Sequence, residues 1–233
     1  MHIIKTKNKN ELSKKAFEII KNEIIKKPAL VLGLATGKTP EKLYDFLIKE
    51  CKNKKISFSK VKFFNLDEYY PIRSKNKKSF SYYLYKTFLN KIDAKPSNIH
   101  FLSGEGDVKK QCREYEKKIK NNKIDILILG IGKNSHIAFN EPNSSLNSKT
   151  RLVLLSDSTR KANKIKFTHA ITLGIKNILS AKKILLLASG KSKAKALKSM
   201  LKGKVNKTCP ASFLKKHKQL ILIIDKNAGS LIW

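Results

Sequence analysis

The residues best suited to chemistry stand in a loop that follows an apolar stretch near the middle of the chain. Residues 124–129 read IDILIL, a run typical of a strand buried on both faces, and Gly130 ends it. The following loop carries Asn134, His136 and Glu141. An imidazole can exchange a proton near neutral pH, and a carboxylate can orient it. The spacing therefore indicates a general acid–base pair, although a turn-capping histidine and a solvated glutamate would give the same pattern.

Two acidic residues follow another predicted strand. Residues 61–66 (VKFFNL) have buried-strand character, and Asp67 and Glu68 come directly after them. In α/β proteins, ligand-binding residues gather just beyond the carboxyl ends of parallel strands. Asp67 is therefore a candidate general base, and a solvated turn is an equally good interpretation of this segment taken alone.

The loop Ala35–Pro40 (ATGKTP) has the features of an anion site. It lies between a predicted buried strand and a helix expected from Glu41 to about Glu50. Thr39 is expected to cap this helix, with Pro40 at its first position, so that free backbone N–H groups would point at one spot. The spacing of a P-loop is absent, and most strand-to-helix turns of this kind are purely structural.

The rest of the chain alternates short apolar runs with amphipathic segments. Strands are predicted at 3–4, 29–34, 61–66, 99–101, 124–129, 151–155, 170–173, 183–188 and 220–225, and helices at 10–24, 41–50, 79–89, 108–121, 158–167, 174–179 and 191–203. No internal repeat or linker interrupts this pattern. It predicts one domain, residues 1–233, of the α/β class: a three-layer, doubly wound, Rossmann-like and mostly parallel sheet with helices on both faces. The aromatic segment 79–89 is a candidate cover for the site.

The strongest compositional signal is a formal net charge of +34, from 51 Lys and Arg residues against 17 Asp and Glu. Such a charge favours nucleic acid or an anionic membrane as a partner. Only four of the basic residues are arginines, however, and arginine is preferred for bidentate recognition of bases and phosphates. We therefore expect no specific nucleic acid and no membrane partner, and we interpret the lysines as the charged surface of an enzyme.

The three cysteines lack a C-x-x-C spacing, which argues against a disulfide framework and a zinc ribbon. The N-terminal residues lack the pattern of a signal peptide, and no segment reaches the length of a membrane span. These features predict a soluble, cytoplasmic protein without a metal site.

Three segments, LGLATGKTP, FFNLDEYY and LGIGKNSHIAFNEP, together resemble the glucosamine-6-phosphate deaminase/isomerase family, in its short bacterial type. The likeness covers essentially the whole chain. The second and third segments are specific to the family, whereas the first is shared in looser form with 6-phosphogluconolactonases. The resemblance implies conversion of glucosamine 6-phosphate and water to fructose 6-phosphate and ammonia, in amino-sugar catabolism, without a metal or organic cofactor.

The resemblance also implies roles for individual residues. His136, supported by Asn134 and Glu141, would open the pyranose ring, and Asp67 would carry a proton from C2 to C1. These four residues would form the catalytic set. The substrate, through its phosphate, would bind to Thr36, Gly37, Lys38, Thr39 and Lys193.

Four positions depart from the pattern of the family. Lys38 stands where a second glycine is usual, and the loop would distort if a positive φ were needed there. Ile165 stands where an arginine contacts the phosphate, and Lys38 could compensate for that loss. Ser135 replaces a glycine. Asn134 replaces the aspartate of some members, so it can hold the imidazole by a hydrogen bond but not by charge.

Three alternative functions stay open. A 6-phosphogluconolactonase-like hydrolase would need no C2 base, and the Asp67 corner with its tyrosines argues against it. A non-catalytic sugar-phosphate sensor would explain Lys38 and Ile165. A basic nucleic-acid-binding protein would lose affinity steeply with salt. The expected assembly is a monomer or a small homo-oligomer.

Overall fold

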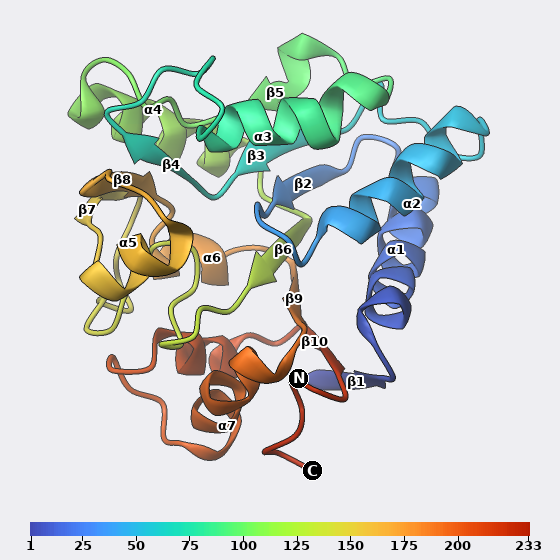
Figure 1. Ribbon diagram of the computed structural model, residues 1–233. Helices are drawn as coiled ribbons and strands as arrows, with labels where there is room; N and C mark the ends of the chain where they lie inside the picture. The colour runs from blue at the N-terminus through green and yellow to red at the C-terminus, as the bar shows by residue number, and fades with distance from the viewer.

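A seven-stranded sheet forms the centre of the computed structural model, which describes residues 1–233 (Figure 1). In spatial order its strands are β1 (His2–Thr6), β10 (Leu220–Asp225), β9 (Lys183–Ala188), β6 (Ile126–Gly130), β2 (Val31–Leu34), β3 (Lys62–Asn65) and β5 (Ile99–His100). Every neighbouring pair is parallel. The central strands β2, β6 and β9 are almost fully buried, which explains their unbroken apolar sequences.

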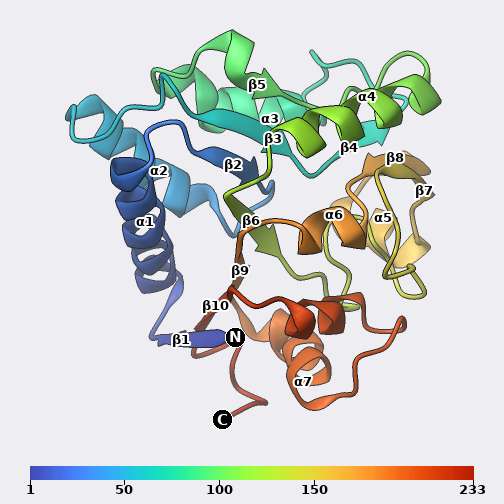
Figure 2. The same cartoon turned by 180° about the vertical axis from the view of Figure 1, so that it is seen from behind.

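Helices cover the two faces of this sheet, as predicted. They are α1 (Lys9–Lys26), α2 (Glu41–Lys52), α3 (Phe80–Thr87), α4 (Val108–Asn121), α5 (Asp157–Asn163), α6 (Ile175–Leu179) and α7 (Ala194–Lys202). In both views α1 and α2 lie on one side of β6 and β9, and α6 and α7 lie on the other (Figures 1 and 2). Single 3-10 turns or short 3-10 helices occupy Leu89–Lys91, Pro96–Asn98, Lys191–Lys193 and Pro210–Lys216.

A second sheet of three antiparallel strands is absent from the predicted pattern. In it, β4 (Asp67–Tyr70) pairs with β8 (His169–Thr172), and β8 pairs with β7 (Arg151–Leu154). The interpretation of Asp67 and its neighbours as a turn is therefore wrong, because they begin a new strand after the single linking residue Leu66. Their partners lie about a hundred residues further along the chain, so a local sequence pattern cannot reveal the pairing.

Two helix boundaries also differ from the prediction. Thr39 does not cap α2, because Pro40 takes the cap position and no side chain bonds to the first turn. The helix expected at 158–167 ends at Asn163, since Lys164 adopts a left-handed conformation with φ of 52°. The other elements agree with the prediction to within one or two residues at most ends, the usual uncertainty of a boundary.

The order of the strands creates a topological switch point between β2 and β6, and such a point is where the binding crevice of an open α/β sheet is expected. These strands are neighbours, but the chain proceeds from β2 to β3 on one side and from β6 to β9 on the other. At such a switch point the loops leave the carboxyl ends of the two strands in opposite directions, which is where ligands bind in open α/β sheets. The loops that flank the crevice are 35–40 and 131–141.

Candidate active site

The loop after β2 presents unpaired backbone donors. Only Gly37 in this loop has a positive φ, 91°, so Lys38 fits without the distortion that a glycine-only conformation would cause. The backbone N–H groups of Gly37, Lys38 and Thr39 donate to no protein acceptor, and the hydroxyls of Thr36 and Thr39 have no protein partner. Because α2 begins directly afterwards, its positive end adds to these donors. The loop has the composition of an anion cradle.

Two side chains from outside this loop donate hydrogen bonds to its backbone carbonyl groups. The Tyr83 hydroxyl of α3 donates to the Gly37 carbonyl at 3.0 Å, and the Lys9 ammonium donates to the Lys38 carbonyl at 2.5 Å. In a trans peptide the carbonyl and the following N–H point in opposite directions. Holding these two carbonyls therefore fixes the N–H groups of Lys38 and Thr39 on the other side of the loop.

In the loop after β6, three side chains form a chain of hydrogen bonds. Asn134 Nδ2 donates to Glu141 Oε2 at 2.6 Å, and His136 Nδ1 lies 2.6 Å from Asn134 Oδ1. Since Oδ1 can only accept, Nδ1 carries the proton of the neutral imidazole and Nε2 has a free lone pair. The His136 ring packs on Gly132, where a Cβ atom would come within 2.3 Å of it. The imidazole is thus held ready to accept a proton at Nε2.

The electrostatic setting keeps this imidazole neutral. Burial lowers the pKa of His136, the carboxylate of Glu141 raises it, and the charge of Lys193 lowers it further, with a net decrease. Glu141 Oε2 lies 3.7 Å from Nδ1, so it stabilises the imidazolium form mainly through Asn134. A neutral histidine at neutral pH is the state that a general base requires.

Asp67 is buried, and its carboxylate accepts no hydrogen bond from the protein; only 8% of the residue is exposed. Burial, and secondly the negative charge of Glu68, raises the pKa of the Asp67 carboxyl to about 8. A carboxylate without protein partners keeps all its acceptor sites for a ligand. A pKa near neutrality is also what general base catalysis at neutral pH favours.

Glu68 has a different role from its neighbour. Its carboxylate accepts hydrogen bonds from Ser79 Oγ at 2.7 Å and from the N–H groups of Phe80 and Ser81 at 2.9 Å each. Glu68 therefore pairs the free donors at the start of α3. This helix is anchored to β4 at its first turn and to the β2 loop through Tyr83, which gives the aromatic segment 79–89 a fixed position.

Thr172 links Asp67 to the loop that carries His136. In the small sheet, Thr172 is the cross-strand partner of Asp67, and its Oγ1 accepts from the N–H of Phe139 at 3.1 Å. Cross-strand neighbours have Cα atoms about 4.5–5.5 Å apart. The loop that carries His136 thus docks on the strand next to Asp67. The structure thus brings the loop that carries the predicted imidazole next to the strand pair that carries the predicted base.

Lys193 stands beyond the end of β9, the strand next to β6. The turn before it has φ of 90° at Gly190, and the N–H of that glycine donates to both carboxylate oxygens of Asp225 at 3.0 and 3.1 Å. Burial, followed by the charge of Lys133, lowers the pKa of Lys193. Its charge acts on His136, so it lies on the same side of the sheet as the predicted acid–base pair.

Two residues that complete this arrangement were not predicted. Thr159 of α5 donates from Oγ1 to Glu141 Oε1, opposite the oxygen that Asn134 binds. Arg151 donates from Nη1 to Asn140 Oδ1 at 2.9 Å, and Asn140 in turn bonds two backbone carbonyls. Arg151 lies on β7 and Thr159 on α5, two elements that the sequence pattern predicted, but their contacts with Asn140 and Glu141 depend on tertiary packing. The residue types of Thr159 and Arg151 alone do not indicate that they support the candidate site.

The structure also shows the surroundings of Ser135 and Ile165, two of the positions that depart from the pattern of the family. Ser135 has φ of 68°, a left-handed conformation that costs a non-glycine residue roughly 1–2 kcal/mol. Ile165 packs against the small apolar cluster under the second sheet, and the flanking Lys164 and Lys166 are exposed. No basic side chain replaces the arginine expected at this position.

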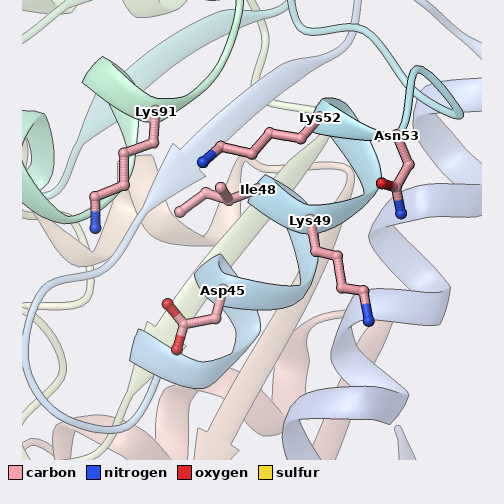
Figure 3. Close-up of a pocket in the computed structure, with 6 residues that line it drawn as sticks. All are labelled: Asp45, Ile48, Lys49, Lys52, Asn53 and Lys91. Carbon is pink, nitrogen blue, oxygen red and sulfur yellow. The ribbon is translucent and has the colours of Figure 1, made fainter.

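A separate cavity of about 410 Å³ lies on the later part of α2, away from the crevice (Figure 3). Lys52 reaches from α2 toward Lys91, and Lys49 points away from both. The residues that line this cavity are Asp45, Ile48, Lys49, Lys52, Asn53 and Lys91. They share no residue with the predicted site.

No group of three or more His, Cys, Asp and Glu side chains is arranged to hold a metal ion. No helix is long and apolar enough to cross a membrane.

Unpaired backbone donors and a hydrogen-bonded imidazole at the switch point of a parallel α/β sheet are typical of the class of protein that binds a small anionic ligand. The chain belongs to the glucosamine-6-phosphate isomerase/6-phosphogluconolactonase family, whose model matches residues 5–222. This finding confirms the resemblance drawn from the three sequence segments.

Individual relatives are similar over their whole length. The chain is 46% identical to a glucosamine-6-phosphate deaminase of Clostridium botulinum strain Langeland, covering 99% of this chain and 98% of that protein. It is also 46% identical to that of Clostridium novyi strain NT, covering 99% of each. A solved structure of a monomeric glucosamine-6-phosphate deaminase has a TM-score of 0.96 at 40% identity, covering 99% of this chain and 100% of that one. The 6-phosphogluconolactonase from Trypanosoma brucei shares the fold, with a TM-score of 0.82 at 19% identity, over 100% and 98% of the chains.

Proposed function

We propose that this protein is a glucosamine-6-phosphate deaminase that converts glucosamine 6-phosphate and water to fructose 6-phosphate and ammonia. The observation that carries the proposal is the buried Asp67 carboxylate, free of protein partners, one strand away from the loop that holds His136. A single carboxylate that moves a proton between two adjacent carbons needs this freedom from other hydrogen bonds. The relatives of 46% identity that carry this name support the same activity.

Ring opening is the first step. His136 Nε2 accepts the proton of the C1 hydroxyl while the C1 to ring-oxygen bond breaks, and the imidazolium returns a proton to the ring oxygen. Asn134 and Glu141 keep Nδ1 as the donor, so Nε2 is the nitrogen that acts. Thr159 fixes the far oxygen of Glu141.

Proton transfer and deamination follow. Asp67 removes the proton from C2 of the open-chain aldose while O1 gains a proton, which gives an enolamine. Asp67 then returns its proton to C1 while the nitrogen releases one, which balances the proton gained by O1 and leaves an imine at C2. Water adds to the imine carbon, and the carbinolamine releases ammonia as the C2 ketone forms. The overall change is a hydrolytic deamination coupled to an aldose–ketose isomerisation. We propose that it proceeds without a metal or an organic cofactor.

The phosphate of the substrate binds to the N–H groups of Gly37, Lys38 and Thr39 and to the ammonium of Lys193. Lys38 compensates for the missing arginine at Ile165. Its exposed side chain starts from the same loop as the backbone donors, which supports this role. The Michaelis constant of Lys38→Gly tests it: an increase of several fold is expected, and an unchanged value would remove this role from the proposal.

Ammonia release from glucosamine 6-phosphate tests the proposed function. The wild type is expected to release ammonia, and Asp67→Asn and His136→Gln are expected to lose activity by about 10²–10⁴-fold, the usual contribution of a positioned acid or base. Full activity in Asp67→Asn would exclude the mechanism. The matched control is Asp45→Asn, which changes an exposed carboxylate on α2 outside the site.

The alternatives receive less support. Lactonase structures near 20% identity share only the fold with this chain, and a lactonase would release acid from a lactone instead of ammonia. A sensor would gain thermal stability with sugar phosphate and show no turnover. A nucleic-acid-binding protein would bind RNA with a steep dependence on salt. The same protein sample can be assayed for all three.

We further propose that the enzyme acts as a monomer, as described for its structural neighbour of 40% identity. Sedimentation at several concentrations tests this state, and a mass that rises with concentration would contradict it. The cytoplasmic location expected from the sequence stays a prediction, which fractionation of the source cells can test.

A further inference from the structure

The position of the Asp67 carboxylate depends on its backbone. Its side chain makes no hydrogen bond with the protein, so neighbouring groups do not orient it directly. The chain also changes sheets at this point: Asn65 is the last residue of β3 in the large sheet, and Asp67 is the first residue of β4 in the small one. Only Leu66 lies between them. Whatever fixes this junction sets the direction in which the carboxylate points.

Asn65 fixes the junction from one side. Its side-chain amide donates from Nδ2 to the backbone carbonyl of Asp67 at 3.0 Å. Its Oδ1 accepts from the N–H of Leu102, just beyond β5, at 2.8 Å. Asn65 is almost completely buried, at 1% exposure. One side chain therefore ties the first residue of the small sheet to the edge region of the large sheet.

Tyr115 holds Asn65 in turn. Its hydroxyl donates to the backbone carbonyl of Asn65 at 2.7 Å and lies 3.1 Å from Asn65 Oδ1. Tyr115 is buried on α4, and burial, with a smaller contribution from the charge of Asp67, raises the pKa of its hydroxyl. The phenol also packs edge-on against Phe64 of β3, with ring centroids 5.7 Å apart. Helix α4 thus reaches the junction through one hydroxyl group.

From these contacts we infer that Asn65 and Tyr115 are positioning residues that aim the Asp67 carboxylate at the substrate. The inference rests on the proposed function, because it assigns to Asp67 the proton transfer between C2 and C1. The side-chain hydrogen bonds of these two residues go to Asp67, to Leu102 and to each other, and none goes to the loops 35–40 and 131–141. Loss of either contact is therefore expected to slow proton transfer and to leave substrate binding almost unchanged.

The main test compares Tyr115→Phe with Tyr85→Phe. The first variant removes the hydroxyl that bonds Asn65 and keeps the ring. The second removes a hydroxyl of α3 that has no hydrogen-bond partner in the protein. The measurements are kcat, KM and the exchange of the C2 proton with deuterium from solvent. The exchange reports the step assigned to Asp67 without the later release of ammonia.

For Tyr115→Phe, kcat and the rate of C2 exchange are expected to fall about 5- to 30-fold, the effect of one lost buried hydrogen bond, with KM within about twofold. Asn65→Ala removes the hydrogen bonds of the Asn65 side chain to Asp67 and Leu102. In this variant kcat and the rate of C2 exchange are expected to fall about 100-fold or more, the effect of a catalytic group held in the wrong orientation. Equal rates for Tyr115→Phe and Tyr85→Phe would overturn the inference. So would an increase in KM that accounts for the whole loss of kcat/KM.

A second measurement is independent of activity. Carbon-13 NMR of the labelled Asp67 carboxyl gives its pKa in the free protein. When the junction loosens, the carboxylate reaches more water, and its pKa is expected to fall in Tyr115→Phe and to stay constant in Tyr85→Phe. An unchanged pKa together with an unchanged rate would exclude a positioning role. If the wild type released no ammonia, the proposed function would fail, and the NMR comparison alone would then decide the positioning role.

Discussion

Asp67 and Glu68 are adjacent acids with opposite surroundings. Asp67 has no protein donor, whereas Glu68 accepts four hydrogen bonds from Ser79 and the backbone around it. The raised pKa of Asp67 comes first from burial and then from the charge on Glu68. A carboxylate that is free to act as a base, Asp67, thus lies next to a hydrogen-bonded structural carboxylate, Glu68, whose charge raises the pKa of Asp67.

This pairing predicts the pH dependence of the reaction. Because Asp67 must be deprotonated to act, kcat/KM is expected to rise with pH until the pKa of about 8 is passed. Glu68→Gln removes the neighbouring negative charge and is expected to move this rise to lower pH. The titration of the substrate is the same for both proteins, so the difference between their profiles reports Asp67. Superimposable profiles, from a variant whose circular dichroism shows it to be folded, would contradict the prediction.

The same pKa makes Asp67 a cost to stability at neutral pH. Between about pH 4 and about pH 8 the folded protein keeps a proton that the unfolded chain has released, so stability falls as pH rises, by up to about 1.4 kcal/mol per unit. Asp67→Asn removes this titration. Its free energy of unfolding in urea is therefore expected to exceed that of the wild type by an amount that grows across this window. A difference that stays constant with pH would show that the Asp67 carboxyl has no raised pKa.

The acid–base residues could be predicted from the sequence, but the side chains that hold them in position could not. The family resemblance implied Asp67 and His136 as acid–base residues, and the structure brings their loops together through Thr172. Thr159, by contrast, bonds Glu141 from a helix 18 residues further along, and no local spacing predicts that contact. Side chains that position others are found only once the tertiary contacts are known.

Among the elements, α3 connects the two halves of the candidate site. Glu68 holds its first turn next to Asp67, and Tyr83 in the same helix holds the carbonyl of Gly37 in the loop after β2. The helix therefore fixes the distance between the base and the anion cradle. Hydrogen bonds thus link α3 to both parts of the candidate site, and the expectation that segment 79–89 covers the site stays a prediction.

Removing the Tyr83 hydroxyl, which links α3 to the loop after β2, is expected to weaken phosphate binding. In Tyr83→Phe the Gly37 carbonyl loses its donor, the loop gains freedom, and KM is expected to rise about 5- to 10-fold, equivalent to one hydrogen bond, while kcat changes less than about twofold. Tyr82→Phe is the matched control, because the Tyr82 hydroxyl has no partner in the protein. Equal KM values for the two variants would show that Tyr83 does not hold the loop in solution.

The strands of the large sheet could be predicted because burial on both faces leaves a continuous apolar run, as in β6 and β9. The strands β7 and β8 of the small sheet were also predicted, at 151–155 and 170–173. The strand β4 was not, because it is four residues long and follows β3 after a single residue. The assembly of these three strands into a second sheet depends on the pairing of β4 with β8, about a hundred residues apart in sequence, which no local pattern shows. Capping by Thr39 failed for a related reason, since the loop conformation is set by contacts with Tyr83 and Lys9.

At the scale of the whole molecule, both ends of the chain enter one sheet. β1 pairs with β10, and the ammonium of Lys5 lies 4.5 Å from the centre of the Trp233 ring. Because neither half can complete the sheet alone, residues 1–233 are expected to unfold as one cooperative unit. Urea unfolding followed by Trp233 fluorescence and by far-ultraviolet circular dichroism should give coincident curves. Two separate transitions would divide the chain into independent units.

The net charge of +34 has opposite consequences for stability and for binding. Only Lys15, Lys21, Lys27, Lys182, Lys183 and Arg160 form ion pairs with carboxylates, so most basic side chains repel one another across the surface. The same field attracts a sugar phosphate dianion. Salt screens both effects, since the Debye length falls from about 30 Å at 0.01 M to about 3 Å at 1 M.

Increasing sodium chloride over this range is therefore expected to raise the melting temperature by several degrees and to raise KM as well. Sucrose, which stabilises proteins without screening charge, should raise the melting temperature alone. Replacing three exposed lysines on α4, Lys109, Lys117 and Lys120, with glutamine should reproduce part of the stabilisation at low salt. If salt lowered the melting temperature, repulsion between the lysines would not limit stability. If KM stayed constant, the attraction of substrate would depend on the contacts at the Gly37 loop and Lys193 alone, and the surplus of lysine would have no part in binding.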